Sequence, residues 1–157
     1  MVDITGQLIA KKNDGVGYII LNNQERRNAM TFEMWRDLPN VLNDYDADDD
    51  IRVVVISGKG RKAFCAGADI SQFEKQRASE EATRIYNDTA SKAAIGLAKI
   101  NKPTIAKIEG FCIGGGLGIA MCCDIRIAND ISSFAVPAAK LGLGYGHEGL
   151  KRLVDVV

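Results

Sequence analysis

The sequence predicts a single α/β domain built around parallel strands. Residues 51–60, IRVVVISGKG, form a nearly continuous β-branched run closed by glycines, which is typical of a strand covered on both faces. A polar stretch with helical spacing follows over residues 79–99, and a second strand, TIAKIEG, is expected after Pro103. A strand, a long helical crossover and another strand predict a right-handed parallel unit.

The segments before this unit predict a hairpin and a helix. Residues 6–23 indicate two strands around the Asp14-Gly15 turn, which is a strong hairpin signal when apolar runs flank it. Residues 31–46 offer a threonine cap and apolar side chains at helical spacing, although Pro39 is expected to kink or interrupt the helix.

The remaining elements repeat the same order. The helix over residues 79–99 is expected to bury Ile85, Ala93 and Leu97. Beyond the second strand, residues 110–124 predict a glycine-rich turn and a short helix, DIRIAND and SSFAVP predict two short strands, and LKRLVDVV predicts the start of a helix. Strand, glycine-rich turn, helix and strand therefore recur within one domain.

Composition excludes several classes of function. The chain has 157 residues, and its 20 basic and 20 acidic side chains cancel, which argues against partners such as nucleic acid or an anionic membrane. Its cysteines lack CxxC spacing, so we expect reduced core thiols. The start, MVDITGQLIA, does not predict a secretory signal, and the longest apolar run is shorter than the roughly 20 residues of a membrane span. We expect a cytoplasmic protein.

Three successive glycines, residues 114–116, are the most unusual feature of the sequence. Glycine costs roughly 0.5–1 kcal/mol against alanine in ordered backbone, so bare backbone must be needed there. A strand, a glycine turn and a helix start direct N–H groups at one point, and residues 65–70, CAGADI, form a second such turn. Two converging N–H groups would form an oxyanion hole for a thioester carbonyl. On composition alone, tight packing of a helix on the sheet explains the glycines equally well.

Four motifs carry a resemblance to a known family. RRNAM, FCAGADI, KPTIAKIEGFCIGGG and CDIRIA occur in an order and at a spacing that resemble the crotonase superfamily, the enoyl-CoA hydratase/isomerases, over nearly the whole chain. The resemblance implies a spiral of repeated ββα units that binds acyl-CoA thioesters. It also implies that the backbone amides of Ala68 and Gly115 form the oxyanion hole.

The same resemblance implies where the substrate binds. Main chain around residues 66–68 is expected to line an adenine pocket, and Asp69 is expected to be a structural cap. Arg26 and Arg27 match positions where the family often carries basic groups near the CoA phosphates, although a solvated pair fits them as well. The expected substrate-binding residues are Arg26, Ala66, Gly67, Ala68, Asp69, Ile70, Gly114 and Gly115.

The sequence departs from the family at two catalytic positions. Hydratases of this family work with two glutamates, and the matching positions here are Gly118 and Ala138, neither of which can move a proton. Tyr145, His147 and Glu148 lie in a loop that, by resemblance, borders the acyl pocket.

These three side chains are the candidate proton-transfer groups, and the backbone amides of Ala68 and Gly115 complete the expected catalytic set. Tyr145 matches a tyrosine of methylmalonyl-CoA decarboxylase-like members, but the histidine that those members carry corresponds to Ala68. His147 and Glu148 fall where hydratases carry small residues. The alternative for each of the three is a loop residue that faces solvent or a neighbouring subunit.

Family members also continue for about half a domain of helices that usually cover the acyl pocket and build a trimer. We therefore expect residues 1–157 to be the spiral core, truncated before a C-terminal helical segment, unless another chain supplies those helices. An exposed apolar edge should remain and favour a homo-oligomer, a trimer or hexamer where those helices are present.

Three functions remain open from the sequence. The first is an enoyl-CoA hydratase/isomerase, a lyase or isomerase of fatty acid metabolism that stabilises an enolate. The second is a methylmalonyl-CoA decarboxylase-like enzyme with Tyr145 as the proton donor. The third is a non-catalytic acyl-CoA-binding protein. No metal or redox cofactor is expected, because coenzyme A enters as part of the substrate.

Overall fold

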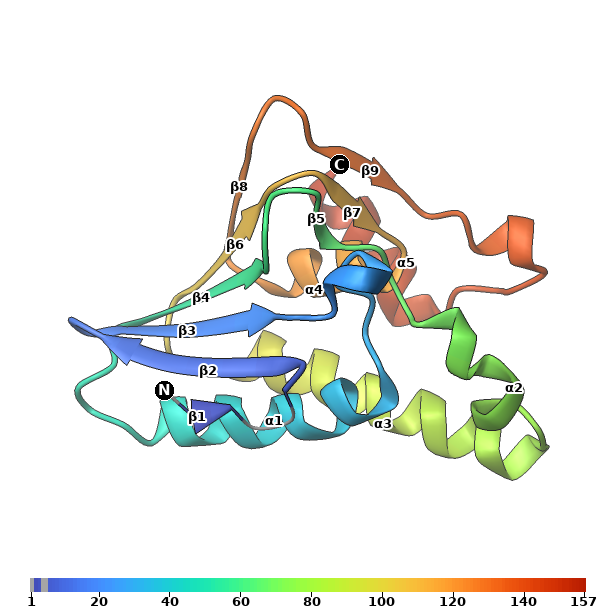
Figure 1. Ribbon diagram of the computed structural model, residues 1–157, viewed down its shortest axis with the longest axis horizontal. Helices are drawn as coiled ribbons and strands as arrows, with labels where there is room; N and C mark the ends of the chain where they lie inside the picture. Colours follow the sequence, from blue (N-terminus) through green and yellow to red (C-terminus); the bar gives the residue numbers. More distant parts are fainter. Residues whose placement is uncertain (1, 4–5) are drawn as a thin grey trace.

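Two sheets organise the chain in the computed structural model, which describes residues 2–3 and 6–157 (Figure 1). Within these residues, the large sheet has the strand order β1-β2-β3-β4-β6-β8 and the small sheet the order β5-β7-β9. The large sheet consists of β1 (Val2–Asp3), β2 (Leu8–Asn13), β3 (Val16–Leu21), β4 (Val53–Gly58), β6 (Thr104–Ile108) and β8 (Ile125–Ala128). The small sheet consists of β5 (Ala63–Cys65), β7 (Phe111–Ile113) and β9 (Ser133–Ala135).

The strand directions confirm the predicted hairpin and crossover. Strands β2 and β3 pair antiparallel around Asp14 and Gly15, whose φ angles of 48° and 79° suit a tight hairpin turn. Strands β3, β4, β6 and β8 are mutually parallel, and so are β5, β7 and β9. Parallel neighbours end on the same side, so the turns that follow β5 and β7 lie together.

Helices follow the strand pairs in a regular order. The helices are α1 (Phe32–Asp46), α2 (Phe73–Gln76), α3 (Glu80–Lys99), α4 (Gly115–Cys122) and α5 (His147–Val156), with 3₁₀ turns η1 (Gln24–Arg26), η2 (Ile70–Gln72) and η3 (Ala138–Leu141). A large-sheet strand, a small-sheet strand and a helix succeed one another three times, as β4-β5-α3, β6-β7-α4 and β8-β9-α5. This is the ββα repeat that the resemblance implied.

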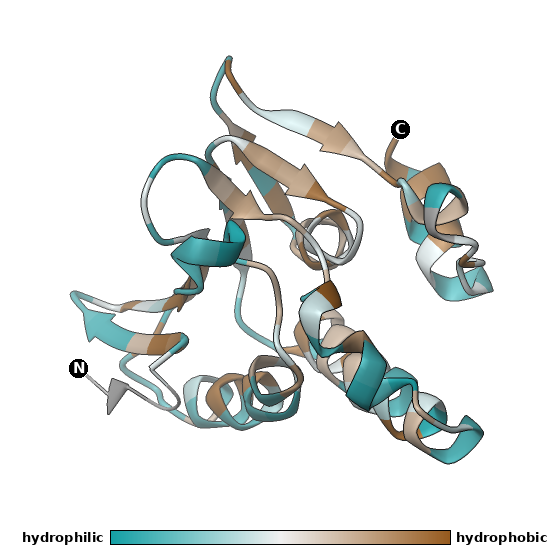
Figure 2. Ribbon diagram, turned by 45° about the vertical axis from the view of Figure 1, so that its right-hand side comes forward, coloured by the Kyte–Doolittle hydropathy of each residue, from teal (hydrophilic) through white to brown (hydrophobic). Residues whose placement is uncertain are grey.

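The core lies between the large sheet and the helices α1 and α3, which run side by side below the sheet in Figure 1. In Figure 2 both helices alternate between hydrophobic and hydrophilic residues, as amphipathic helices do. In β4, Val54 and Ile56 are fully buried, whereas Val53 and Val55 are only half-buried. The prediction that both faces of this strand are covered is therefore confirmed fully for one face and only in part for the other.

Local signals in the two long helices are largely confirmed. The Thr31 side chain accepts a hydrogen bond from the Met34 backbone N–H at 3.3 Å and caps α1. The helix continues through Pro39 without interruption. In α3, Ala93 and Leu97 are buried, but Ile85 is 44% exposed and the neighbouring residue, Tyr86, takes the buried position.

Candidate active site

The first predicted turn leaves one backbone amide free. After β5, the Met30 backbone N–H donates to the Gly67 carbonyl at 2.7 Å, and the Asp69 N–H donates to the Met30 carbonyl at 2.9 Å. These two bonds form a parallel bridge between Met30 and Ala68, so the N–H of Ala68 points away from Met30. Within the described ranges, this N–H has no hydrogen-bond partner.

The three glycines of the second turn have three different structural roles. Gly114 has φ +53°, a conformation that favours glycine. A Cβ on Gly116 would lie 2.2 Å from the Cys65 carbonyl oxygen, so this glycine lets α4 pack tightly on β5. A Cβ on Gly115 would lie 3.6 Å from the Ala68 nitrogen, so this glycine faces the other turn. Tight packing, one of the two explanations left open by the composition, therefore accounts for Gly116.

The backbone nitrogens of Ala68 and Gly115 lie close to each other. An amide nitrogen lies about 2.5 Å from its own Cβ position, so the 3.6 Å approach puts the two nitrogens within about 6 Å of each other. Two donors at 2.7–3.1 Å from one oxygen can be up to about 6 Å apart. The Gly115 N–H belongs to the first turn of α4, where helix geometry provides no partner. We call this pair of amides the cradle.

Tyr145 is the predicted side chain that lies nearest the cradle. Its hydroxyl is 3.5 Å from the Cβ position of Gly114, and its ring edge is 3.5 Å from that of Gly149. Burial raises the pKa of the Tyr145 hydroxyl, so the phenol remains protonated at neutral pH and can donate.

His147 and Glu148 are placed differently. Both side chains are exposed in the first turn of α5. In the described part of the chain neither forms a hydrogen bond or an ion pair. Nothing in their geometry connects them to the cradle.

The predicted substrate-binding residues divide into a buried and an exposed group. Asp69 is buried and caps η2, accepting from the Ser71 N–H at 3.0 Å and from the Ser71 hydroxyl at 2.6 Å. It therefore fixes the turn that carries Ala68. Arg26 and Ile70 are exposed, and Ala66 and Gly67 form the backbone of the same turn as Ala68.

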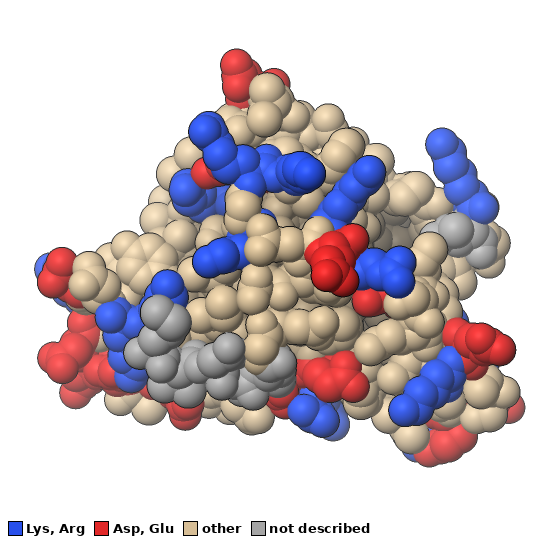
Figure 3. All heavy atoms as spheres, in the orientation of Figure 1, with Lys and Arg blue, Asp and Glu red and all other residues tan. Residues whose placement is uncertain are grey.

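The residue after Arg26 contributes a cation beside an aromatic ring. The Arg27 guanidinium stacks over the Phe111 ring, with 5.0 Å from its carbon to the ring centroid. Figure 3 shows Lys and Arg side chains gathered over this upper part of the molecule.

Two aromatic side chains near the cradle were not predicted from the sequence. Trp35 of α1 is 6% exposed, and its Cζ2 lies 3.3 Å from the Cβ position of Gly115. Tyr86 of α3 is also 6% exposed, and burial raises the pKa of its hydroxyl. A tryptophan or tyrosine on an amphipathic helix is usually a core residue, so the sequence held no signal for either.

Cys65 stands directly before the first turn but is not a nucleophile. Its side chain is fully buried, and burial raises the pKa of the thiol to about 12. The thiolate form is therefore negligible at neutral pH. Cys65 serves as a small packing residue beneath Gly116.

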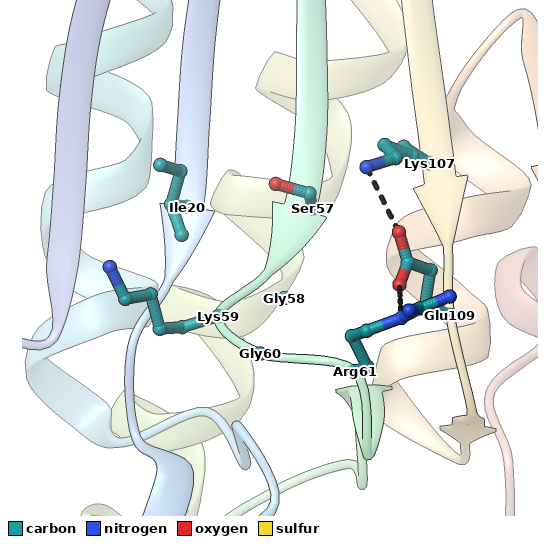
Figure 4. Close-up of a pocket in the computed structure, with 8 residues that line it drawn as sticks. All are labelled: Ile20, Ser57, Gly58, Lys59, Gly60, Arg61, Lys107 and Glu109. Carbon is teal, nitrogen blue, oxygen red and sulfur yellow. Dashed lines mark hydrogen bonds and ion pairs between the residues drawn. The ribbon is translucent and has the colours of Figure 1, made fainter.

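A separate hollow of about 330 Å³ lies at the ends of β3, β4 and β6 (Figure 4). Glu109 accepts from Arg61 at 3.2 Å and from Lys107 at 2.9 Å, and the hydrogen bond from Lys107 lowers the pKa of Glu109. Lys59 also lines the hollow, but its side chain extends away from this group (Figure 4). None of the predicted site residues lines this hollow, so it is distinct from the cradle.

The residues that the structure describes lack two further features. They contain no group of three His, Cys, Asp or Glu side chains arranged to hold a metal ion. No helix in residues 2–3 and 6–157 is long and apolar enough to cross a membrane.

The chain matches a known protein family. The family model described as enoyl-CoA hydratase/isomerase matches residues 11–157. The short-chain-enoyl-CoA hydratase of Clostridium acetobutylicum is 33% identical over 150 residues, which make up 96% of this chain and 57% of that protein. The chain thus spans a little over half the length of such relatives.

Solved structures agree with the sequence comparison. An enoyl-CoA hydratase/carnithine racemase from Magnetospirillum magneticum matches with a TM-score of 0.91 and 35% identity, over 96% of this chain and 56% of that one. The enoyl-CoA hydratase from Bacillus anthracis matches with a TM-score of 0.87 and 30% identity, over 96% and 58%. This chain therefore belongs to the enoyl-CoA hydratase/isomerase family and has the crotonase fold.

Proposed function

We propose that the chain is an acyl-CoA enzyme whose cradle stabilises the enolate of a thioester. The observation that carries this proposal is the approach of the Ala68 nitrogen to within 3.6 Å of the Cβ position of Gly115. Backbone hydrogen bonds hold both turns, from Met30 to Gly67 and from Gly114 to Ala135, so little reorganisation is needed when charge develops on the oxygen. In known cases the loss of one such donor costs about 3–4 kcal/mol of transition-state stabilisation.

The reaction is of the enoyl-CoA hydratase/isomerase type, as family membership suggests. Water addition or double-bond migration needs a group that moves a proton at the substrate carbons. The positions matched to the usual glutamates are Gly118 and Ala138, so another group must do this work. Tyr145 is the candidate whose placement favours it, because its hydroxyl borders Gly114.

Decarboxylation of a malonyl-type CoA is the second candidate, and the same tyrosine favours it. In that reaction the bond between the α-carbon and the carboxylate breaks, carbon dioxide leaves, and the electron pair remains as the thioester enolate. A protonated phenol then delivers a proton to the α-carbon. The cradle and one donor are sufficient, so no second carboxylate is required.

A panel of CoA thioesters distinguishes these functions. The full chain is incubated with crotonyl-CoA, a 3-enoyl-CoA and methylmalonyl-CoA, and binding is measured beside turnover. Hydration or double-bond migration supports the first reaction, and release of carbon dioxide supports the second. Tight binding without turnover indicates the non-catalytic alternative, and absence of binding contradicts the proposal.

Two variants then test the side chains. Tyr145→Phe should lower turnover while leaving the cradle amides in place. Glu148→Gln is the matched change on an exposed neighbour, and an effect there would restore Glu148 as a candidate. If both variants keep the wild-type rate, neither side chain takes part.

We also propose that the chain self-associates. Ile125 and Ile127 of β8 and Phe134 of β9 are at least half exposed, with 51%, 57% and 50% of their surfaces accessible. Apolar patches of this kind mark interaction surfaces. Sedimentation velocity across a concentration series should show oligomers, and a monomer at every concentration would contradict the proposal.

A further inference from the structure

Two buried side-chain N–H donors that form no hydrogen bond lie around the same residue, Tyr86. Within residues 2–3 and 6–157, the buried side-chain nitrogens or oxygens that lack a partner are Trp35 Nε1 and Arg77 Nε. Native proteins pair nearly all such groups, so each unpaired one requires an explanation. Both side chains lie against Tyr86, whose ring centroid is 5.3 Å from the Arg77 guanidinium carbon. Burial raises the pKa of the Tyr86 hydroxyl, and the neighbouring Trp35 indole partly offsets this rise, although its N–H forms no hydrogen bond of normal geometry.

This polar group borders the cradle. Trp35 Cζ2, which is two bonds from Nε1, lies 3.3 Å from the Cβ position of Gly115. Besides burial, the charge of Asp69, in the turn that carries Ala68, raises the pKa of the Tyr86 hydroxyl. Trp35 of α1 therefore links the proposed thioester position to Tyr86 and, through Tyr86, to Arg77.

Arg77 brings a positive charge without a counter-ion. It is partly buried, and its contacts are the faces of two rings, Phe73 at 4.6 Å and Tyr86 at 5.3 Å. In the described part of the chain it forms no ion pair, whereas the more exposed Arg61 and Arg84 are both paired with carboxylates. Buried cations normally have an anionic partner, and arginine binds carboxylates well.

A saturated or unsaturated alkyl chain would give these donors nothing to bind. A carboxylate at the far end of the acyl group would accept hydrogen bonds from the indole and the phenol, and it would neutralise the guanidinium. We propose that the acyl-CoA ligand of this chain is the thioester of a dicarboxylic acid, whose free carboxylate is recognised by Trp35, Tyr86 and Arg77. The inference rests on the proposed acyl-CoA function and narrows its substrate class.

Matched thioesters test the inference. Succinyl-CoA and butyryl-CoA have acyl groups of equal length that end in a carboxylate and a methyl group, and glutaryl-CoA and valeryl-CoA are the next such pair. Calorimetry with the full chain should show at least one dicarboxylic thioester binding tenfold or more tightly than its methyl-ended match. Equal or weaker binding of both dicarboxylic thioesters, while the methyl-ended ones bind, overturns the inference and leaves the proposed function standing. Absence of binding by all four contradicts the proposed function itself.

Variants locate the recognition. Arg77→Met should abolish the preference for the carboxylate while changing the affinity for the methyl-ended thioester less than twofold. Arg84→Met is the control, because Arg84 is exposed on α3 and paired with Glu81 and Asp88, and it should retain the preference.

Trp35→Phe keeps an aromatic ring and removes the N–H, and it should weaken only the dicarboxylic ligand, by several-fold. Thermal unfolding checks that each variant folds. If Arg77→Met does not fold, Arg77→Gln and Trp35→Phe decide the question in its place. A full preference in these variants overturns the assignment.

Discussion

Gly116→Ala tests whether the cradle requires close packing of α4 on β5. A Cβ there would lie 2.2 Å from the Cys65 carbonyl oxygen and 2.7 Å from the Cys65 Cβ. Ordinary contacts between heavy atoms are about 3.5–4.0 Å, so α4 must withdraw from β5 by at least about 1 Å. Cys65 is fully buried in a packed interior and cannot move aside.

The expected cost follows from two opposing effects. Overpacking of a well-packed core typically costs about 1–3 kcal/mol, and a clash with backbone belongs at the upper end. Replacement of a helical glycine returns about 1 kcal/mol. We therefore expect Gly116→Ala to lower the free energy of unfolding by about 2 kcal/mol.

Gly96→Ala is the matched control. Gly96 lies inside α3, and its Cβ would meet Leu42 Cδ1 at 3.8 Å, which is an ordinary contact. This variant should gain about 0.5–1 kcal/mol from helix propensity alone. Urea unfolding of both variants measures the difference between them.

Binding is the second readout. A 1 Å retreat of α4 would stretch a hydrogen bond of about 2.9 Å from the Gly115 N–H to about 3.9 Å, beyond its useful range. Gly116→Ala should therefore bind acyl-CoA at least tenfold more weakly, whereas Gly96→Ala should bind normally. If Gly116→Ala is as stable as Gly96→Ala and binds as well, the tight seating of α4 is refuted.

Three further predictions concern stability and catalysis. Asp124 accepts two hydrogen bonds of 2.7 Å from Thr104, which lower the pKa of its carboxyl. Asp124→Asn should lower the free energy of unfolding by only about 1 kcal/mol at pH 7, because the carboxylate is largely exposed. Urea unfolding should show the difference in stability between wild type and variant vanishing as the pH falls below 3.8 and through the lower pKa of the folded state. An unchanged difference at pH 2 argues against the pairing. The Tyr45 hydroxyl lies 2.9 and 3.0 Å from two carbonyls of the hairpin, so Tyr45→Phe should cost about 1 kcal/mol in thermal unfolding, and no loss would rule out these bonds. Gly118→Glu with Ala138→Glu should add crotonyl-CoA hydration, seen as loss of enoyl absorbance, because a Cβ on Gly118 meets open space; binding without a gain in rate would contradict the assigned positions.

The elements that the sequence predicts correctly are those whose structure depends on neighbouring residues. The hairpin follows from Asp14 and Gly15, whose backbone conformations need no distant contact. The start of α1 follows from the Thr31 cap in the same way. The meeting of the two turns follows from a general rule, because neighbouring parallel strands end at the same edge of a sheet.

Burial that depends on distant elements could not be predicted from the sequence. Ile85 and Tyr86 are adjacent on α3, and a small rotation of the helix decides which of them faces the core. Trp35 of α1 is separated from Arg77 and Tyr86 by at least 42 residues of sequence. No local sequence pattern could therefore predict that these three side chains lie together. The partial exposure of one face of β4 could not be predicted, because a strand covered on one face and a strand covered on both can have the same β-branched sequence.

A crystal structure with a bound ketone analogue of an acyl-CoA, in which a methylene replaces the sulfur, tests the central claim most directly. The account predicts that the carbonyl oxygen lies about 2.7–3.1 Å from the backbone nitrogens of both Ala68 and Gly115. A carbonyl oxygen more than about 3.5 Å from either nitrogen would contradict it.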